Sequence, residues 1–335
     1  MGQQQTSDRK KDHIDLAFQS VIANQDSRFY YEPLFSGHPA DNLTPISFLG
    51  KQMNAPIWIS SMTGGTKEAG TINNNLAKAC GEFGLGMGLG SCRIILQDDE
   101  YLPDFQMRKL VGDFPLYANL GIAQLEEIFE AKKAYLVGEL IKRTESDGLI
   151  IHVNPLQEWL QPEGDIFKEP PLTTIQRTID LGVNCIVKEV GQGFGPDSLR
   201  ELMKLPLAGI DFGAHGGTNF SKLEMHRSQE MRKQAYQKIA QWGHTAEEMV
   251  GFHNCLIEEL RDKNTFADVI ISGGVQDFMD GYYLLQKSEA NAVYGQASAF
   301  LRHARADYES LQAFVELQIN GFRLANTFLK LRPKL

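Results

Sequence analysis

Four polar side chains of complementary chemistry lie within seven residues of this chain: His152, Asn154, Gln157 and Glu158. An imidazole, two amides and a carboxylate could bind a metal-bound anion and orient it for proton transfer. Glu158 is the candidate Mg²⁺ ligand, since this ion usually takes one or two carboxylates together with water and substrate phosphates. A helix cap at Asn154, before Pro155, would explain only part of the group.

Glycine-rich turns follow two later apolar runs, as Ser272-Gly273-Gly274 and Gly295-Gln296-Ala297. Glycine lets the backbone approach an anion closely, and the last two loops of many (β/α)8 barrels bind phosphate. Either turn alone could be an ordinary connection. The pair predicts a phosphate site, to which Gly216-Gly217-Thr218 could add a hydroxyl and further amides.

Three further sets of basic residues could either bind an anionic ligand or have an ordinary structural role. Lys188 interrupts an apolar strand and either points into the barrel mouth, beside an electron-rich ring or phosphate, or faces outward with Glu189. Arg93, after Gly90-Ser91-Cys92, offers a fork for diphosphate oxygens, although such an arginine is usually an ion-pair partner. Arg9, Lys10 and His13 form a basic cluster at helical spacing that alone would be a solvated face.

Eight short apolar runs place these residues. The predicted strands are Pro56–Ser61, Gly86–Gly90, Pro115–Leu120, Gly148–Val153, Cys185–Val190, Ala208–Phe212, Asp268–Ser272 and Ala292–Tyr294. The predicted helices are Ala123–Arg143, Thr173–Leu181, Pro196–Lys204, Thr245–Asp262, Asp277–Gln286 and Ala304–Leu331, with a short amphipathic helix near Ile14 and Phe18.

Short strands that alternate with helices indicate a parallel sheet, and eight of them favour a closed barrel over an open doubly wound sheet. The predicted class is therefore α/β, a (β/α)8 TIM barrel. Residues 1–54 form an N-terminal extension, expected to pack on the barrel and at a subunit boundary, and residues 55–335 form the barrel domain. Residues 219–244 form an elaborated, charged and helix-prone loop after strand six.

Composition narrows the class of protein. The chain has 335 residues, a net charge of −9 and 42% hydrophobic residues, with no dense basic face, which argues against nucleic acid as a partner. The start is polar, and no apolar run reaches the length of a membrane span. Four scattered cysteines lack metal-site spacing, so we expect reduced thiols in a cytoplasmic protein.

In their order and spacing, these motifs resemble the type 2 isopentenyl diphosphate isomerase family over nearly the whole chain. The matching segments are Arg9-Lys10-x-x-His13, Ser61-Met62-Thr63-Gly64-Gly65, Gly90-Ser91-Cys92-Arg93, Asn119-Leu120-Gly121, His152-x-Asn154-x-x-Gln157-Glu158, Val187-Lys188-Glu189-Val190-Gly191, Gly216-Gly217-Thr218-Asn219-Phe220 and Ser272-Gly273-Gly274. Two segments of the loop after strand six, Ala214-His215 and Trp242-Gly243-His244-Thr245, depart from the family pattern, which puts the lid and assembly geometry in question.

The resemblance implies an FMN enzyme that interconverts isopentenyl and dimethylallyl diphosphate with Mg²⁺ and reduced flavin. NADPH or NADH would reduce the flavin, with no net redox change, and the protein would be a homotetramer or homo-octamer. Gln157, His152 and Lys188 would be catalytic, and Glu158 would hold Mg²⁺. FMN would contact Ser61, Met62, Thr63, Ser91, Asn119, Lys188, Thr218, Gly273, Gly274, Gln296 and Ala297. The substrate would contact Arg9, Lys10, His13, Ser91, Arg93, His152, Asn154 and Gln157.

Two alternatives stay open. An FMN-dependent oxidoreductase of the 2-hydroxyacid oxidase or dehydrogenase type could use the same barrel, with a catalytic base and an arginine for a substrate carboxylate. The cluster from His152 to Glu158 suits a metal diphosphate better. A catalytically silent flavin-binding or assembly protein is the second alternative, and the same intact cluster counts against it.

Overall fold

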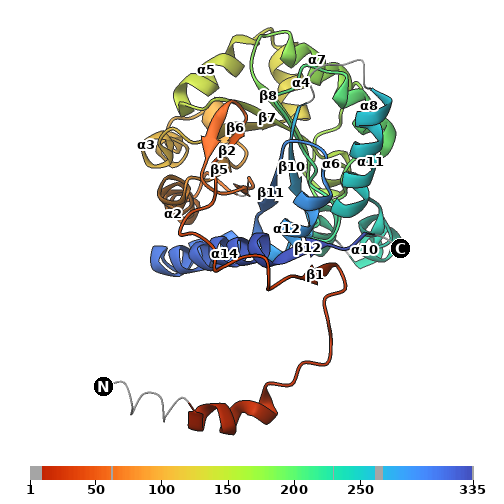
Figure 1. Ribbon diagram of the computed structural model, residues 1–335. Coiled ribbons are helices and arrows are strands. Elements are labelled where there is room, and N and C mark those ends of the chain that lie inside the picture. Colours follow the sequence, from red (N-terminus) through yellow and green to blue (C-terminus); the bar gives the residue numbers. More distant parts are fainter. Residues whose placement is uncertain (1–9, 62, 229, 261–266, 334–335) are drawn as a thin grey trace.

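The computed structural model describes residues 10–61, 63–228, 230–260 and 267–333. Eight parallel strands form a closed barrel in the order β10, β11, β4, β5, β6, β7, β8, β9 (Figure 1). Their bounds are β4 Ile57–Ile59, β5 Gly86–Gly88, β6 Leu116–Gly121, β7 Gly148–Val153, β8 Cys185–Glu189, β9 Gly209–Asp211, β10 Asp268–Ser272 and β11 Ala292–Gln296. The predicted barrel is confirmed, with every predicted strand in place.

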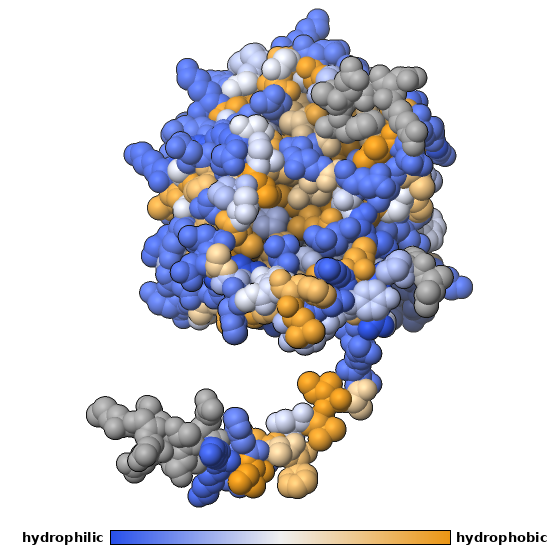
Figure 2. All heavy atoms as spheres, in the orientation of Figure 1, coloured by the Kyte–Doolittle hydropathy of each residue, from blue (hydrophilic) through white to orange (hydrophobic). Residues whose placement is uncertain are grey.

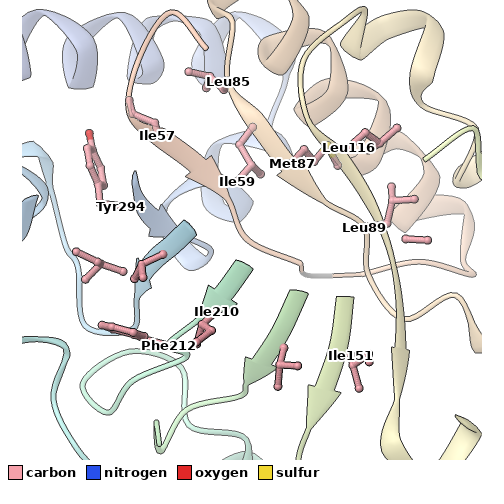
Figure 3. Close-up of a cluster of buried hydrophobic side chains, with 14 of the residues drawn as sticks. Ile57, Ile59, Leu85, Met87, Leu89, Leu116, Ile151, Ile210, Phe212 and Tyr294 are labelled. Atoms are coloured by element: carbon pink, nitrogen blue, oxygen red, sulfur yellow. The ribbon is translucent and has the colours of Figure 1, made fainter. Parts of the chain in front are cut away.

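Helices surround the barrel and pack on the outward side chains of its strands. These side chains are apolar and almost completely buried, as Figure 3 shows for Ile57, Met87, Leu116 and Ile151. The helices are α2 Lys67–Phe83, α3 Arg108–Val111, α4 Ile122–Glu130, α5 Tyr135–Thr144, α6 Pro155–Leu160, α7 Pro171–Ile179, α8 Pro196–Met203, α11 Ala246–Glu259, α12 Phe278–Lys287, α13 Ser298–Ala304 and α14 Tyr308–Phe328.

The inside of the barrel has its own apolar cluster, made by alternate strand residues that include Trp58, Tyr117 and Ile150. The hairpin of β2 (Ile46–Phe48) and β3 (Lys51–Met53) packs on this cluster with two fully buried side chains, Phe48 and Met53. Side chains therefore fill the barrel up to this level, and space for a ligand lies only beyond it, at the carboxyl ends of the strands.

The N-terminal extension has two parts. Residues 10–16 are helical and continue into η1 (Ala17–Gln19); this part is exposed and lies away from the barrel (Figure 1). Apolar side chains such as Phe18 and Ile22 are 90% and 85% exposed along it. Figure 2 shows hydrophobic surface along this extension. Further along, the chain joins the body through β1 (Phe29–Tyr31), which pairs antiparallel with β12 (Leu329–Leu331).

Two predicted helices are wrong, one in its continuity and one in its bounds. The expected helix Ala123–Arg143 is two helices, α4 and α5, because Lys132 adopts a left-handed conformation with φ 55° between them. The expected helix Ala304–Leu331 is α14, which begins only at Tyr308, where the Asp307 side chain accepts the amide of Ser310. It ends at Phe328, because residues Leu329–Leu331 form strand β12 and pair with β1. The loop after β9 does contain helices, α9 (Phe220–Arg227), α10 (Glu230–Tyr236) and η4 (Ile239–Gln241).

Candidate active site at the carboxyl ends of the strands

A polar layer lies directly above the apolar filling of the barrel. Side chains alternate along a strand, so the residue two places after an inward apolar residue also points inward. These inward positions, in strand order, are Ser60, Asn119, His152, Lys188, Asp211 and Ser272. His152 pairs in register with Lys188, and Lys188 with Asp211, so the three side chains share one level and one side of the sheet. The outward alternative for Lys188 is therefore wrong.

Asn119 fixes the orientation of His152. The Asn119 side-chain amide donates to the Leu89 carbonyl at 3.0 Å, which turns its oxygen towards His152. That oxygen lies 2.8 Å from His152 Nδ1, so Nδ1 carries the proton and Nε2 keeps its lone pair. Burial, with a smaller effect from the Lys188 charge, lowers the pKa of His152 to about 3. At neutral pH the site therefore holds a neutral imidazole of defined tautomer.

The lowered pKa of His152 predicts a pH dependence of stability. An unfolded histidine titrates near pH 6.5, so between pH 6.5 and about 3 unfolding takes up a proton at this residue. The contribution of neutral His152 to the free energy of unfolding is complete above that window. It is lost as the pH falls through the window, by about 1.4 kcal/mol per pH unit. We expect denaturant titrations of His152→Gln to show a shallower loss of stability over these pH values than the unsubstituted chain. Equal slopes would contradict the buried neutral imidazole.

Gly121 lies so close to His152 that no side chain fits. A Cβ on Gly121 would stand 2.4 Å from His152 Nε2 and 2.6 Å from Gln124 Oε1. We expect Gly121→Ala to displace the imidazole and to lower the free energy of unfolding by about 1–3 kcal/mol, the usual cost of overpacking. Gly138→Ala is the matched control: nothing lies within 4 Å of its Cβ in helix α5, so it should stabilise by about 0.5–1 kcal/mol. Denaturant melts of both variants test this, and equal effects would contradict the close approach.

Lys188 is held by the loop that follows its own strand. It is 8% exposed, and its Nζ donates to the Glu189 carbonyl at 2.8 Å. The Glu189 carboxylate accepts the backbone amides of residues 191, 192 and 193 at 2.7, 2.6 and 2.8 Å, which fixes the turn after β8. The cation is thus presented at the mouth on a rigid support.

Asp211 closes the same level of the barrel from β9. It is fully buried, and its Oδ1 accepts a short hydrogen bond from Ser272 Oγ, which in turn accepts the amide of Gly213. Burial raises the pKa of Asp211, while the nearby Lys188 charge and the bond from Ser272 lower it. Its Oδ2 has no hydrogen-bond partner in the described part of the chain.

Three of the four predicted residues follow strand β7 and are hydrogen-bonded to one another, whereas His152 lies within β7 and bonds to Asn119. The Asn154 side-chain amide donates to Gln157 Oε1 at 3.1 Å and to Glu158 Oε1 at 2.9 Å. The other Glu158 oxygen accepts the backbone amide of Asp165 at 2.9 Å, and the Asp165 carboxylate pairs with Arg93 at 3.0 Å. Arg93 thus lies beside this cluster, where an anionic ligand could replace its carboxylate partner.

Glu158 is the one carboxylate of the four predicted residues, and the neighbouring Asp165 carboxylate is paired with Arg93. Among the described residues no group of three or more His, Cys, Asp or Glu side chains is arranged to hold an ion. The cluster therefore fits a metal that brings most of its own ligands, such as Mg²⁺ with water and phosphate oxygens, and does not fit a closed structural metal site.

A cavity of about 650 Å³ opens beside Lys188 and runs along the ends of β8 to β11. Its lining includes seven of the predicted cofactor contacts: Ser61, Lys188, Thr218, Gly273, Gly274, Gln296 and Ala297. Gly273 has φ 91°, and a Cβ there would stand 2.1 Å from the Ala214 carbonyl oxygen, so this turn requires glycine. Buried polar atoms at its walls, Ser60 Oγ, Ser61 Oγ and Gln296 Oε1, lack partners within the described chain.

The remaining predicted contacts lie in several places. Thr63, Ser91 and Asn119 are outside the cavity lining, although Asn119 contacts His152. Arg9 and Met62 lie outside the described residues. Lys10 and His13 are exposed on the N-terminal helix, which lies away from the barrel (Figure 1).

Four residues of the site were not singled out from the sequence: Ser60, Asp211, Arg302 and His303. Ser60 and Asp211 carry a usable signal, because each lies at an inward position at the end of a buried strand. Arg302 and His303 line the cavity from α13, one turn beyond the last glycine-rich segment. Nothing in their spacing distinguishes them from a solvated helix end.

Comparison with known proteins gives isopentenyl-diphosphate delta-isomerases among the sequence relatives. An isopentenyl-diphosphate delta-isomerase of Rickettsia typhi is 35% identical over 334 residues, 97% of this chain and 94% of the relative. One of Nostoc sp. is 33% identical over 326 residues, 94% of this chain and 89% of the relative. No family model matches the chain.

Solved structures share the fold at much lower identity. A mandelate oxidase variant with the monooxide FMN adduct aligns with a TM-score of 0.56 and 13% identity, covering 91% of this chain and 88% of that chain. A flavocytochrome b2 variant with sulfite bound aligns with a TM-score of 0.61 and 13% identity, covering 93% of this chain and 78% of that chain.

No helix in the described ranges is long and apolar enough to span a bilayer.

Proposed function

The chain belongs to the isopentenyl-diphosphate delta-isomerase family, and from that premise we propose that it interconverts isopentenyl and dimethylallyl diphosphate with reduced FMN and Mg²⁺. The observation that carries the chemistry is the shared level of His152 and Lys188 beside the Glu158 cluster. A ring held by Lys188 and a diphosphate held near Glu158 would meet in this mouth.

The cavity fits FMN in its chemistry. Its lining contains no Asp or Glu side chain among the described residues, its glycine turns expose backbone amides, and its walls hold buried polar atoms without partners. Such a lining favours an anionic ligand with several polar groups. One of the fold neighbours, the mandelate oxidase variant, was itself solved with an FMN adduct.

Reduced FMN, when bound, supplies an electron-rich ring that can exchange a proton with the alkene and stabilise positive charge that develops on it. Lys188 would stand at the edge of that ring and balance its negative charge. Neutral His152, with Nε2 free to accept, would orient the substrate or hold a proton in transit. Gln157, tied to Asn154, would position the allylic carbon and act as an orienting or relay group.

The diphosphate would lie between Glu158 and Arg93. Glu158 would hold Mg²⁺ through the oxygen now bonded to Asn154, and Arg93 would exchange Asp165 for phosphate oxygens. The binding energy of the diphosphate would position the hydrocarbon end of the substrate, which itself offers few contacts.

We further propose a homo-oligomer, tetramer or octamer, in the cytoplasm. The exposed apolar side chains of the extension support a subunit contact, because such side chains are rarely left in solvent. Arg9, Lys10 and His13 would then complete the site of a neighbouring subunit. The four cysteines are free, which suits a reducing compartment.

Turnover with limited reductant tests this function against the oxidoreductase alternative. We expect the FMN-loaded protein, with Mg²⁺, to form dimethylallyl diphosphate in large molar excess over the NADPH consumed. One nicotinamide oxidised per product, or oxidation of a 2-hydroxyacid, would favour the oxidoreductase. A flavin-loaded protein that forms no product would favour the silent flavoprotein.

A further inference from the structure

The lining of the proposed FMN cavity contains basic side chains that lie far from Lys188 in the sequence. Besides Lys188, the charged or ionisable side chains in its lining are Arg302 and His303, both on α13. His303 stacks on Phe314 of α14, with ring centroids 4.5 Å apart and an angle of 15° between the planes. The stacking holds His303 in the cavity wall, and Arg302 directly precedes it in α13.

Arg302 has no ion-pair or hydrogen-bond partner in the described chain, unlike most arginines here. Its neighbour Arg305, the C-cap of α13, is hydrogen-bonded to Glu68 at 2.8 Å and does not line the cavity. An unpaired guanidinium at the rim of a cavity without acidic side chains is suited to a phosphate dianion.

We propose that Arg302 is a specificity-determining residue that binds the terminal phosphate of the flavin and so selects FMN over riboflavin. This inference rests on the proposed function, which places the ring at Lys188 and leaves the glycine turns for the phosphate. Gly273 and Gly274 have φ 91° and 74° and line the same cavity as Arg302. The glycine turns would donate backbone amides to the phosphate, and Arg302 would supply the positive charge.

Binding of two flavins to apoprotein tests the proposal without measuring turnover. Arg302→Ala should weaken FMN binding about tenfold, the size of one charge-assisted hydrogen bond partly screened by solvent. Riboflavin, which lacks the phosphate, should bind this variant within about twofold of the unsubstituted protein. Arg302→Lys should recover part of the FMN affinity, and Arg305→Ala should leave both affinities unchanged.

Flavin fluorescence quenching gives both dissociation constants. An FMN affinity unchanged in Arg302→Ala would overturn the assignment, as would equal losses for FMN and riboflavin, which would indicate a packing role. Failure of the unsubstituted apoprotein to bind FMN would instead overturn the proposed function, so the two failures are distinguishable.

Discussion

Replacing Lys188 by glutamine should lower turnover about 10²–10³-fold, the usual cost of removing one preorganised charge from an active site. Lys188 is nearly buried, lies in register with His152 and Asp211, and lines the cavity proposed for FMN. Without it, negative charge on the reduced ring would be unbalanced beside the buried Asp211 carboxylate. The midpoint potential of bound flavin should therefore fall together with the rate.

Two measurements separate this effect from misfolding. Anaerobic flavin titration gives the potential, and a denaturant melt gives the stability of the same preparation. Lys204→Gln is the control, because Lys204 forms a surface pair with Glu201 and its substitution removes the same charge without touching the mouth. A Lys188→Gln protein with normal turnover and an unshifted potential would show that this cation has no role in the chemistry.

Glu158→Gln should raise the Mg²⁺ concentration needed for half-maximal activity by about tenfold or more, at least the loss typical of outer-shell substitutions. Glu158 is the only carboxylate among the four predicted residues, and the nearby Asp165 carboxylate is paired with Arg93. The substitution keeps the size of the side chain and an oxygen for Asn154, but one oxygen can no longer accept the Asp165 amide.

Activity measured against Mg²⁺ concentration, at saturating flavin, tests the role of Glu158. Glu163→Gln is the matched control. Glu163 lies close by in sequence, and its carboxylate forms a surface ion pair with Arg227. An unchanged Mg²⁺ requirement in Glu158→Gln would move the metal site elsewhere. A matching shift in Glu163→Gln would indicate a general effect of lost negative charge.

Much of the barrel was predictable because its strands are short, apolar and evenly spaced. Gly148–Val153 and Asp268–Ser272 have the predicted bounds, since both are buried runs between clear turn residues. Helix breaks were harder. The left-handed Lys132 depends on local packing, whereas the Asp307 cap before Tyr308 was a readable signal that helical periodicity alone overlooks.

Some features of the site could likewise be predicted from the sequence, and others could not. Inward positions follow from period two, so the facing of His152 and Lys188 could be derived once the strands were placed. The tautomer of His152 could not, because it depends on Asn119 and Leu89 from two other segments. Arg302 was also out of reach, since it enters the cavity from a helix turn whose position only the fold defines.

Solvent deuterium incorporation tests the central claim most directly. Reduced, FMN-loaded protein with Mg²⁺ is incubated anaerobically with isopentenyl diphosphate in deuterated water, and the product is analysed by mass spectrometry. We predict dimethylallyl diphosphate that carries deuterium from solvent, with the flavin still reduced at the end. Fully reduced, fully loaded protein that yields no product, or product without solvent deuterium, would contradict proton transfer in this mouth.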